Sequence, residues 1–248
     1  MSTVYFITGG NRGIGYNLVE QLAARPNTKV ITTARDVEKA TQLKDLQKKH
    51  SNVEVLKLDV SSEESIDTLD GQLQKVAPEG IDIFISNAGI ADAYYAVKDA
   101  PRSVWLKHHQ TNVLGPIFVY QVVRPYLLKK STRQIVFVSS IAGSVGGFIP
   151  FSTSAYGQSK AALNMTVKQI SFEDAADGFT VIAIHPGMVS TDMGQYGITK
   201  FPEGNFDHIL AMVITPEVSA TKQLEVIDGL TKESNGVFYS YDGTIAPY

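Results

Sequence analysis

The sequence predicts one α/β domain over residues 1–248, in which a doubly wound, seven-stranded parallel sheet carries helices on both faces. Short apolar runs alternate with longer amphipathic segments from end to end of the 248 residues. Most of these runs are continuous in Val, Ile and Phe, which is typical of strands covered on both faces. No repeat, low-complexity tract or long linker divides the chain, and its length suits one large core.

Seven apolar runs are expected to form the strands of this sheet. They cover residues 4–8, 29–33, 53–58, 81–86, 135–139, 180–184 and 237–241. Amphipathic segments predict helices over residues 14–24, 116–130 and 155–176. The first of these ends at Arg25-Pro26-Asn27, a stop signal, and Ser61-Ser62-Glu63-Glu64 offers a capping box for a further helix. Strands that alternate with helices favour a parallel, doubly wound sheet.

A glycine-rich turn, Thr8-Gly9-Gly10-Asn11-Arg12-Gly13-Ile14-Gly15, joins the first strand to the first helix. Such a turn lets the backbone approach a phosphate and directs the helix N-terminus at it. Tyr16-Asn17 replace the Lys-Ser/Thr of a P-loop, and Leu18 replaces the third glycine of G-x-G-x-x-G. The remaining pattern, T-G-x-x-x-G-x-G, indicates a phosphate-binding turn, with a tight turn that binds nothing as the alternative.

This spacing resembles that of the classical short-chain dehydrogenase/reductase family, and the resemblance covers almost the whole chain. In the family pattern, Asp59-Val60 and Asn87-Ala88-Gly89 lie near the adenine ring, and the segment Pro186–Thr191 holds the nicotinamide carboxamide. The cofactor-binding residues that the motifs and this resemblance imply are Gly9, Asn11, Arg12, Gly13, Ile14, Gly15, Arg35, Asp59, Val60, Asn87, Ala88, Gly89, Tyr156, Lys160, Pro186, Gly187, Val189 and Thr191.

The end of the second strand favours NADP(H) over NAD(H). NAD sites place an acidic residue there to hold the ribose 2′-hydroxyl, whereas this chain has Ala34 followed by Arg35. Arg35 and Arg12 can together bind a 2′-phosphate through charge-assisted hydrogen bonds. Two alternatives stay open, since Asp36 could reach the ribose and Arg35 could simply be solvated at a helix start.

Tyr156 and Lys160 form a Tyr-x-x-x-Lys pair, which the spacing places on one face of a helix. An adjacent ammonium lowers the pKa of a phenol from its usual value of about 10 toward neutrality. Resemblance to the family adds Ser140 and Asn112 as catalytic residues, with Asn112 holding a water that links Lys160 to solvent. The loop over residues 143–155 is longer than the common family spacing, so Ser139 is an alternative to Ser140.

Within the family, the glycine turn, the stretch Thr33-Ala34-Arg35-Asp36 and the ending Phe238-Tyr239-Ser240-Tyr241-Asp242-Gly243 are similar to the C-factor/sniffer-type carbonyl reductases. This resemblance implies an NADPH-dependent reductase of ketones, aldehydes and diketones. A substrate lid is expected around residues 192–212. An apolar or aromatic substrate is expected because that lid and the loop before Tyr156 are rich in such residues, namely Met193, Tyr196, Ile198, Phe201, Phe206, Ile209, Phe148, Ile149 and Phe151.

Composition excludes several other classes of protein. The net charge of −3 argues against a nucleic-acid partner, and no apolar stretch is long enough to cross a membrane. Zero cysteines exclude disulfides and thiolate catalysis, so a cytoplasmic protein is the default expectation. No metal site is expected, because the five histidines form no ligand pattern and the neighbours His108 and His109 face different directions on a helix.

Two other functions are compatible with the same residues. One is a cofactor-binding regulator or scaffold, which this fold can also be, although such proteins generally lose the tyrosine or lysine that this chain keeps. The other is an alcohol dehydrogenase that works mainly in the oxidative direction. Family members often pair through the helix that carries the tyrosine, so a homodimer or homotetramer is possible.

Overall fold

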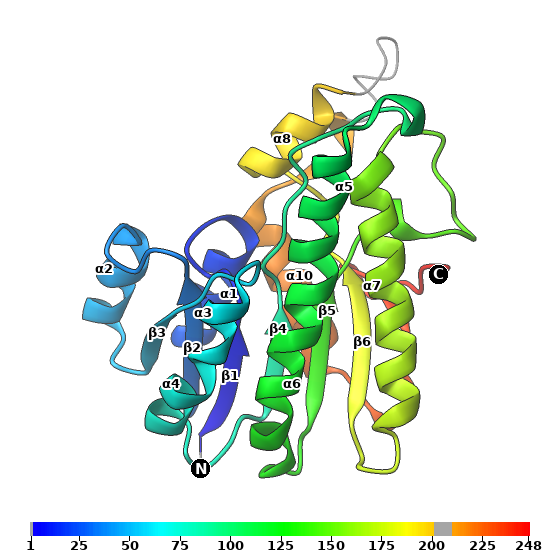
Figure 1. Ribbon diagram of the computed structural model, residues 1–248. Helices are drawn as coiled ribbons and strands as arrows, with labels where there is room; N and C mark the ends of the chain where they lie inside the picture. The colour runs from blue at the N-terminus through cyan, green and yellow to red at the C-terminus, as the bar shows by residue number, and fades with distance from the viewer. Residues whose placement is uncertain (1, 201–209) are drawn as a thin grey trace.

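A parallel sheet forms the middle of the structure (Figure 1). The computed structural model describes residues 2–200 and 210–248. Within these residues, seven strands pair in parallel in the order β3-β2-β1-β4-β5-β6-β9. The strands are β1 Thr3–Ile7, β2 Thr28–Ala34, β3 Val53–Lys57, β4 Ile83–Ser86, β5 Gln134–Val138, β6 Thr180–His185 and β9 Phe238–Ser240. The predicted seven-stranded sheet is confirmed, and every strand begins and ends within two residues of its predicted range.

Helices cover both faces of this sheet. They are α1 Gly13–Ala23, α2 Thr41–Lys49, α3 Glu63–Asp67, α4 Leu69–Val76, α5 Arg102–His109, α6 Gly115–Leu128, α7 Ser154–Glu173, α8 Asp192–Ile198 and α10 Pro216–Asp228. Leucine and valine side chains of α4, α6 and α7 share one apolar core with Phe6, Phe84 and Phe137 of the strands. Side chains of α1, α2 and α10 form a second core on the opposite face. The sheet is therefore doubly wound.

The strand order reverses between β1 and β4, which lie side by side. From β1 the chain proceeds outward to β2 and β3, and it then returns to β4 and continues to β5 and β6 on the other side. A crevice forms at the carboxyl ends of the strands where the order reverses, and ligands bind there in open α/β sheets. The glycine turn follows β1 directly, so it lies at this point.

Two helix starts differ from the sequence prediction. Ser62 caps α3 by accepting a hydrogen bond from the Ser65 amide, but no capping box forms. The Ser65 hydroxyl instead accepts a hydrogen bond from the Asp59 amide at the end of β3. The predicted helix 116–130 is α6, and α5 runs into it through a π-helical turn, Gln110–Leu114. Such π turns are often found at functional sites.

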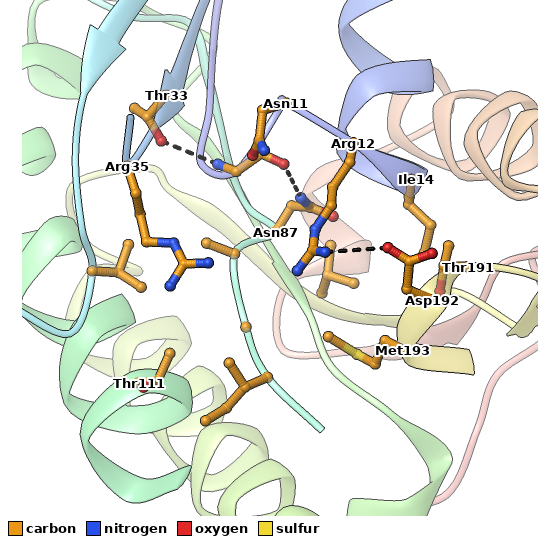
Figure 2. A pocket seen from close by; sticks show the side chains of 18 of the residues that line it. Asn11, Arg12, Ile14, Thr33, Arg35, Asn87, Thr111, Thr191, Asp192 and Met193 are labelled. Atoms are coloured by element: carbon orange, nitrogen blue, oxygen red, sulfur yellow. Dashed lines mark hydrogen bonds and ion pairs between the residues drawn. The ribbon is translucent and has the colours of Figure 1, made fainter. Parts of the chain in front are cut away.

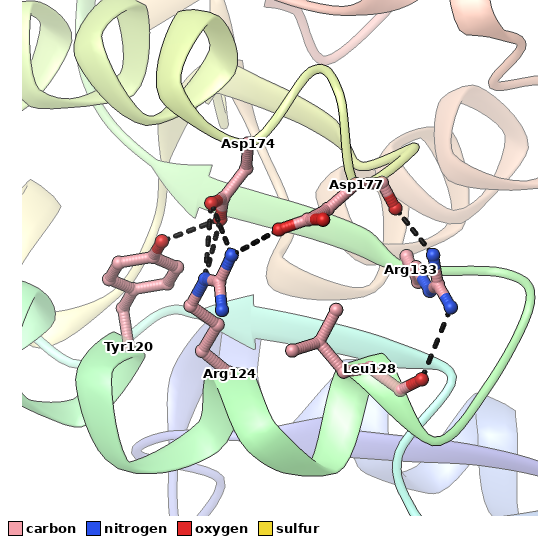
Figure 3. A network of polar contacts seen from close by, with 6 residues as sticks. All are labelled: Tyr120, Arg124, Leu128, Arg133, Asp174 and Asp177. Carbon is pink, nitrogen blue, oxygen red and sulfur yellow. Dashed lines mark hydrogen bonds and ion pairs between the residues drawn. The ribbon is translucent and has the colours of Figure 1, made fainter.

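Buried ion pairs and hydrogen bonds join α6 to the end of α7 (Figure 3). Asp174 is 4% exposed and accepts three hydrogen bonds from the Arg124 guanidinium and one from the Tyr120 hydroxyl. Arg124 also donates to Asp177, which is more exposed. This network keeps the helix that carries Tyr156 in register with its neighbour.

Residues 247 and 248 pack against the loop between β5 and α7. The Ser144 hydroxyl donates to the Pro247 carbonyl at 2.6 Å, and the Gly146 amide donates to the Tyr248 carbonyl at 2.7 Å. The Tyr248 ring packs against Phe238 of β9 at a centroid distance of 5.5 Å. A small ribbon of β7 Met188–Val189 and β8 Val213–Ile214 lies beyond the main sheet. No helix in the described part of the chain is both long and apolar enough to cross a bilayer.

Candidate active site

A cavity of about 860 Å³ opens at the carboxyl ends of the strands (Figure 2). Its wall comes from segments far apart in the sequence, all of which end at this edge of the sheet. The residues that line it include Gly9, Asn11, Arg12, Gly13, Ile14, Gly15, Arg35, Asp59, Val60, Asn87, Ala88, Gly89, Tyr156, Lys160, Pro186 and Thr191. The structure therefore brings together most of the predicted cofactor-binding residues.

The glycine turn is held against the end of β4 by hydrogen bonds. The Thr8 hydroxyl accepts from the Asn87 and Ala88 amides, and the Asn87 side chain donates to the Thr8 and Gly9 carbonyls. A Cβ on Gly15 would lie 2.2 Å from the Gly9 carbonyl oxygen, so the helix can approach this closely only with glycine there. Arg12, the N-cap of α1, makes no side-chain hydrogen bond to the helix amides. The turn therefore offers a close backbone cradle at a helix N-terminus, which fits a dinucleotide pyrophosphate.

The end of β2 presents a guanidinium and no carboxylate to the cavity. Ala34 is buried, whereas Arg35 is exposed and its side chain extends into the cavity in Figure 2. Asp36 is held elsewhere, since its carboxylate accepts from the Lys39 amide and pairs with the Lys39 ammonium at 3.2 Å. These hydrogen bonds to Lys39 lower the pKa of Asp36. Asp36 is also not among the residues that line the cavity, which argues against it as a ribose ligand.

Arg12 borders the same cavity but points to a different partner. Its guanidinium pairs with the carboxylate of Asp192 at 3.2 Å, at the first residue of α8. Both side chains are well exposed, so the ion pair itself contributes little stability. Because exposed pairs exchange readily, the Arg12 guanidinium remains available to an anion in the cavity.

Tyr156 and Lys160 lie one turn apart on α7 and both face the cavity. The Lys160 ammonium is buried and donates to the Val138 carbonyl at the end of β5, at 2.8 Å. Burial lowers the pKa of Lys160 to about 8, because it disfavours the charged form. Burial also raises the pKa of Tyr156, and a hydrogen bond with Ser140 opposes this increase. The pair therefore rests as a protonated phenol beside an ammonium that can lose its proton.

Ser140 and Ser139 point in different directions at the end of β5. The Ser139 hydroxyl hydrogen-bonds to the Asn164 side chain of α7 at 2.5 Å, away from the phenol. Ser140 starts the short turn Ile141–Gly143 and is the serine whose hydroxyl hydrogen-bonds to Tyr156. This geometry favours Ser140 over Ser139 as the serine that acts with Tyr156.

Asn112 lies inside the π-helical turn and is 1% exposed, where a lone mid-helix Asn is usually solvated. Its side chain accepts from the Ile90 amide and donates to the Ile90 carbonyl and the Ser159 hydroxyl. A Cβ on Gly89 would lie 3.1 Å from the Asn112 oxygen and 3.7 Å from the Lys160 nitrogen. Asn112 and Lys160 therefore meet next to Gly89; Gly89 and Lys160 line the cavity, whereas Asn112 lies behind them and is not among the lining residues.

Comparison with known proteins agrees with this arrangement. The family model described as short chain dehydrogenase matches residues 3–200. The chain belongs to the short-chain dehydrogenase/reductase family. It is 50% identical over 244 residues to the uncharacterized oxidoreductase YKL071W of Saccharomyces cerevisiae, with 97% of this chain and 95% of the relative covered.

Two solved structures of the same family are similar over the whole chain. Carbonyl reductase Sniffer of D. melanogaster has a TM-score of 0.89 at 30% identity, with 100% of both chains covered. The NADPH-bound carbonyl reductase from chicken fatty liver has a TM-score of 0.88 at 27% identity, with 100% of this chain and 94% of that chain covered. This short-chain dehydrogenase/reductase is therefore an oxidoreductase with a nicotinamide cofactor and a small-molecule substrate.

Four of the predicted cofactor-binding residues differ in how they relate to the cavity. The Asp59 carboxylate is partly occupied, because it accepts from the Ser61 amide and hydroxyl. Gly187 has φ +88° and packs its backbone against Ile214 and Tyr241, and Val189 is buried in β7. These two residues are not among the residues that line the cavity. The Thr191 hydroxyl caps α8 by accepting from the Gly194 amide.

The lid and loop residues are only partly as expected. Met193 lines the cavity, and Phe201, Phe206 and Ile209 lie outside the described residues. Phe148 is 74% exposed and Ile149 44% exposed, so these two do not form the expected wall. His108 is buried with Nδ1 on the Val104 carbonyl, whereas His109 is exposed. Within residues 2–200 and 210–248, no three His, Asp or Glu side chains cluster as a metal site would require.

Sequence reasoning missed two residues that shape this site. The Thr33 hydroxyl accepts from the Gly9 amide at 3.1 Å and so joins the glycine turn to β2. A polar residue inside the buried run of β2 was an available signal. Tyr94, in the irregular segment after β4, packs its ring against that of Tyr156 at a centroid distance of 6.2 Å. No sequence motif marks Tyr94.

Proposed function

We propose that this protein is an NADPH-dependent reductase of a small apolar or aromatic ketone, aldehyde or diketone. The observation that carries the proposal is that Tyr156, Lys160 and Arg35 line one cavity. Ser140 hydrogen-bonds to Tyr156, and Asn112 lies with Lys160 next to Gly89 of the cavity wall. The two similar carbonyl reductases, one of them NADPH-bound, support the same reaction class.

In the proposed reaction, NADPH supplies the hydride that is added to the carbonyl carbon. Tyr156 donates its phenolic proton to the carbonyl oxygen, and Ser140 donates a hydrogen bond to the same oxygen. Burial keeps Tyr156 protonated until the reaction, which suits a general acid. The Lys160 ammonium favours the phenolate that remains after proton transfer, and it also holds the nicotinamide ribose.

Asn112 has a positioning role in this proposal. It fixes Ile90 through both backbone groups and holds the Ser159 hydroxyl, so it joins the segment after β4 to α7. A water bound beside Asn112 would return a proton from solvent to Lys160 after each turnover. This role depends on the family resemblance together with the closeness of Asn112 and Lys160 to Gly89.

The proposed preference for NADPH depends on charge at the end of β2. Arg35 has its side chain in the cavity, Ala34 provides no acceptor for a ribose hydroxyl, and Asp36 is paired with Lys39. A 2′-phosphate between Arg35 and Arg12 would gain charge-assisted hydrogen bonds, and Arg12 would leave Asp192 to make them. The same proposal assigns the residues around 192–212 as the lid over the substrate. Met193 of α8 lines the cavity.

Replacing Tyr156 with Phe tests the proposed function. NADPH oxidation is followed with a panel of diketones, aromatic aldehydes and ketoesters, and the NADPH dissociation constant is measured separately. The Tyr156→Phe variant should lose about 10²- to 10⁴-fold in turnover, the contribution of a general acid, while NADPH binding changes by a few-fold at most. Tyr95→Phe, a change at an exposed tyrosine, is the matched control and should keep full activity.

Two results would contradict the proposal. A Tyr156→Phe variant with more than a tenth of the wild-type rate would exclude Tyr156 as the acid. Tight NADPH binding by a wild-type protein that reduces none of the panel would instead favour the regulatory or scaffold function.

A further inference from the structure

Four aromatic rings from three separate segments gather beside the catalytic tyrosine. Tyr94 lies at their centre, with ring centroid distances of 5.8 Å to Phe151, 6.2 Å to Tyr156 and 5.8 Å to Tyr196. Phe151 precedes α7 and Tyr196 belongs to α8, the helix next to the cofactor cavity. We refer to Tyr94, Phe151 and Tyr196 as the aromatic cluster.

The segment that carries Tyr94 is held firmly on its N-terminal side. Asn112 binds both backbone groups of Ile90, and Asp92 pairs with the Lys107 ammonium of α5. Ala93, next to Tyr94, is buried. The Tyr94 ring is therefore presented at a fixed position, which a residue that selects a substrate requires.

The sequence of α8 is adapted to this ring. A Cβ on Gly197 would lie 2.9 Å from the Tyr94 hydroxyl oxygen, so any larger residue there would displace the ring. Burial, together with the nearby Tyr156 and Tyr196, raises the pKa of Tyr94 well above its usual value. Tyr94 thus stays a neutral phenol across the physiological range and adds no charge beside the reacting oxygen.

The cluster is also open on one side. Tyr196 is 40% exposed, and Phe151 and Tyr94 are half-buried. Tyr156 belongs both to the cofactor cavity and to this group of rings. Tyr94, Phe151 and Tyr196 are not among the residues that line that cavity, so a carbonyl compound whose oxygen reaches the Tyr156 hydroxyl can direct a substituent out of the cavity toward the aromatic cluster.

We propose that Tyr94 is a specificity-determining residue, whose ring packs against the aromatic ring of an aryl ketone or aryl aldehyde. This inference rests on the proposed function and names its substrate class. Aromatic pairs prefer offset or edge-to-face geometry and contribute beyond the area that they bury, whereas a saturated ring of similar size gains only the burial. The protein should therefore distinguish a phenyl from a cyclohexyl substituent.

Binding of unreactive amides tests the inference without turnover. Benzamide and cyclohexanecarboxamide are titrated by calorimetry into the NADPH-loaded wild type and into its Tyr94→Leu and Tyr94→Phe variants. The wild type should bind benzamide more tightly. Tyr94→Leu should weaken benzamide binding about 2- to 10-fold, which is the contribution of one aromatic pair, and should change cyclohexanecarboxamide binding little. Tyr94→Phe should restore the preference, because it keeps the ring.

The matched control is Tyr95→Leu, which removes an exposed neighbouring ring and should leave both amides unaffected. An unchanged NADPH dissociation constant shows that a variant is folded. Equal effects of Tyr94→Leu on the two amides, or none on either, would overturn the inference.

A second arm compares reduction of acetophenone with that of cyclohexyl methyl ketone. The kcat/KM of Tyr94→Leu should fall for acetophenone and not for the saturated ketone. Absence of turnover with both ketones and the wider panel, alongside a phenyl preference in the amide titration, would refute the proposed function and leave the role of Tyr94 in place.

Discussion

Burial acts in opposite directions on the two central residues of the site. It lowers the pKa of Lys160, whose charged form is the protonated one, and raises the pKa of Tyr156, whose charged form is the phenolate. With a pKa of about 8, Lys160 is about nine-tenths protonated at pH 7. The resting site therefore holds a full phenol proton and most of the ammonium charge near neutral pH, which is the state that a reductase needs.

The pH dependence of reduction should follow the protonation of Lys160. As pH rises through about 8, the ammonium loses its proton, and kcat/KM for NADPH in the free enzyme should fall. Lys160→Arg keeps the charge at all these pH values and should move the fall to higher pH, at some cost in rate. The pH–rate profiles of both proteins between pH 6 and 10 check this. Lys107→Arg, at another lysine of the cavity wall, should leave the profile unchanged. An identical fall in the wild type and in Lys160→Arg would contradict the assignment.

Cofactor choice also belongs to single residues. Arg35→Ala should weaken NADPH binding about 10- to 100-fold, because a charge-assisted hydrogen bond contributes about 1.5–3 kcal/mol. NADH binding should change little. Combining Ala34→Asp with Arg35→Ala should invert the preference, because the new carboxylate repels a phosphate and accepts from ribose hydroxyls. Dissociation constants for both cofactors measure this. Arg25→Ala, at a pair with Asp228 outside the cavity-lining residues, is the control. If Arg35→Ala reduced the affinity for NADH and NADPH equally, Arg35 would only support the fold or stack on adenine.

At the scale of elements, the start of α1 depends on the absence of one side chain. A Cβ on Gly15 would lie 2.2 Å from the Gly9 carbonyl oxygen and 2.5 Å from the Asn87 amide nitrogen. Gly15→Ala should therefore destabilise the fold by about 1–3 kcal/mol, as overpacking does, and weaken NADPH binding as well. Urea unfolding and cofactor titration measure the two effects. Gly71→Ala is the matched control on α4, where a Cβ meets nothing within 4 Å among the described residues. Gly71→Ala should stabilise the fold by about 0.5–1 kcal/mol. If both variants lost the same stability, the steric explanation for Gly15 would be wrong.

The pairing of α6 with α7 depends on a buried carboxylate. Asp174→Ala removes the acceptor of three hydrogen bonds from Arg124 and one from Tyr120. We expect the unfolding free energy to fall by about 1–3 kcal/mol. This is less than for a buried charge left without any partner, because Arg124 still pairs with Asp177. Asp177→Ala, at a half-exposed residue, should cost less than about 1 kcal/mol. The urea midpoints of the two variants measure these losses of stability. Equal losses would show that burial of Asp174 does not increase its contribution to stability.

For the whole molecule, most of the fold could be predicted because its signals are local. Continuous apolar runs identify strands such as β1 and β5, and the order of strands then places Tyr156, Lys160 and the glycine turn at one edge. The aromatic cluster could not be predicted, because Tyr94 meets its partners only after three segments far apart in the sequence have packed together. The burial of Asn112 depends likewise on a π-helical turn, which has no clear sequence signal. Phe148 looked like a wall residue by composition, and its exposure reflects the path of its loop.

The contacts of residues 247 and 248 have a consequence for the order in which the chain is made. During synthesis the N-terminal part leaves the ribosome first and begins to fold while the rest is still being added. In the loop that follows Ser140, however, the Ser144 hydroxyl and the Gly146 amide donate hydrogen bonds to the carbonyls of Pro247 and Tyr248. Strand β6 likewise pairs with β9, which is synthesised after every other strand of the sheet. A nascent chain therefore leaves the β6 edge open until β9 has been synthesised, and the Ser140 turn lacks these two hydrogen bonds until residues 247 and 248 have emerged. Oxidoreductase activity should appear only with chains that include these residues.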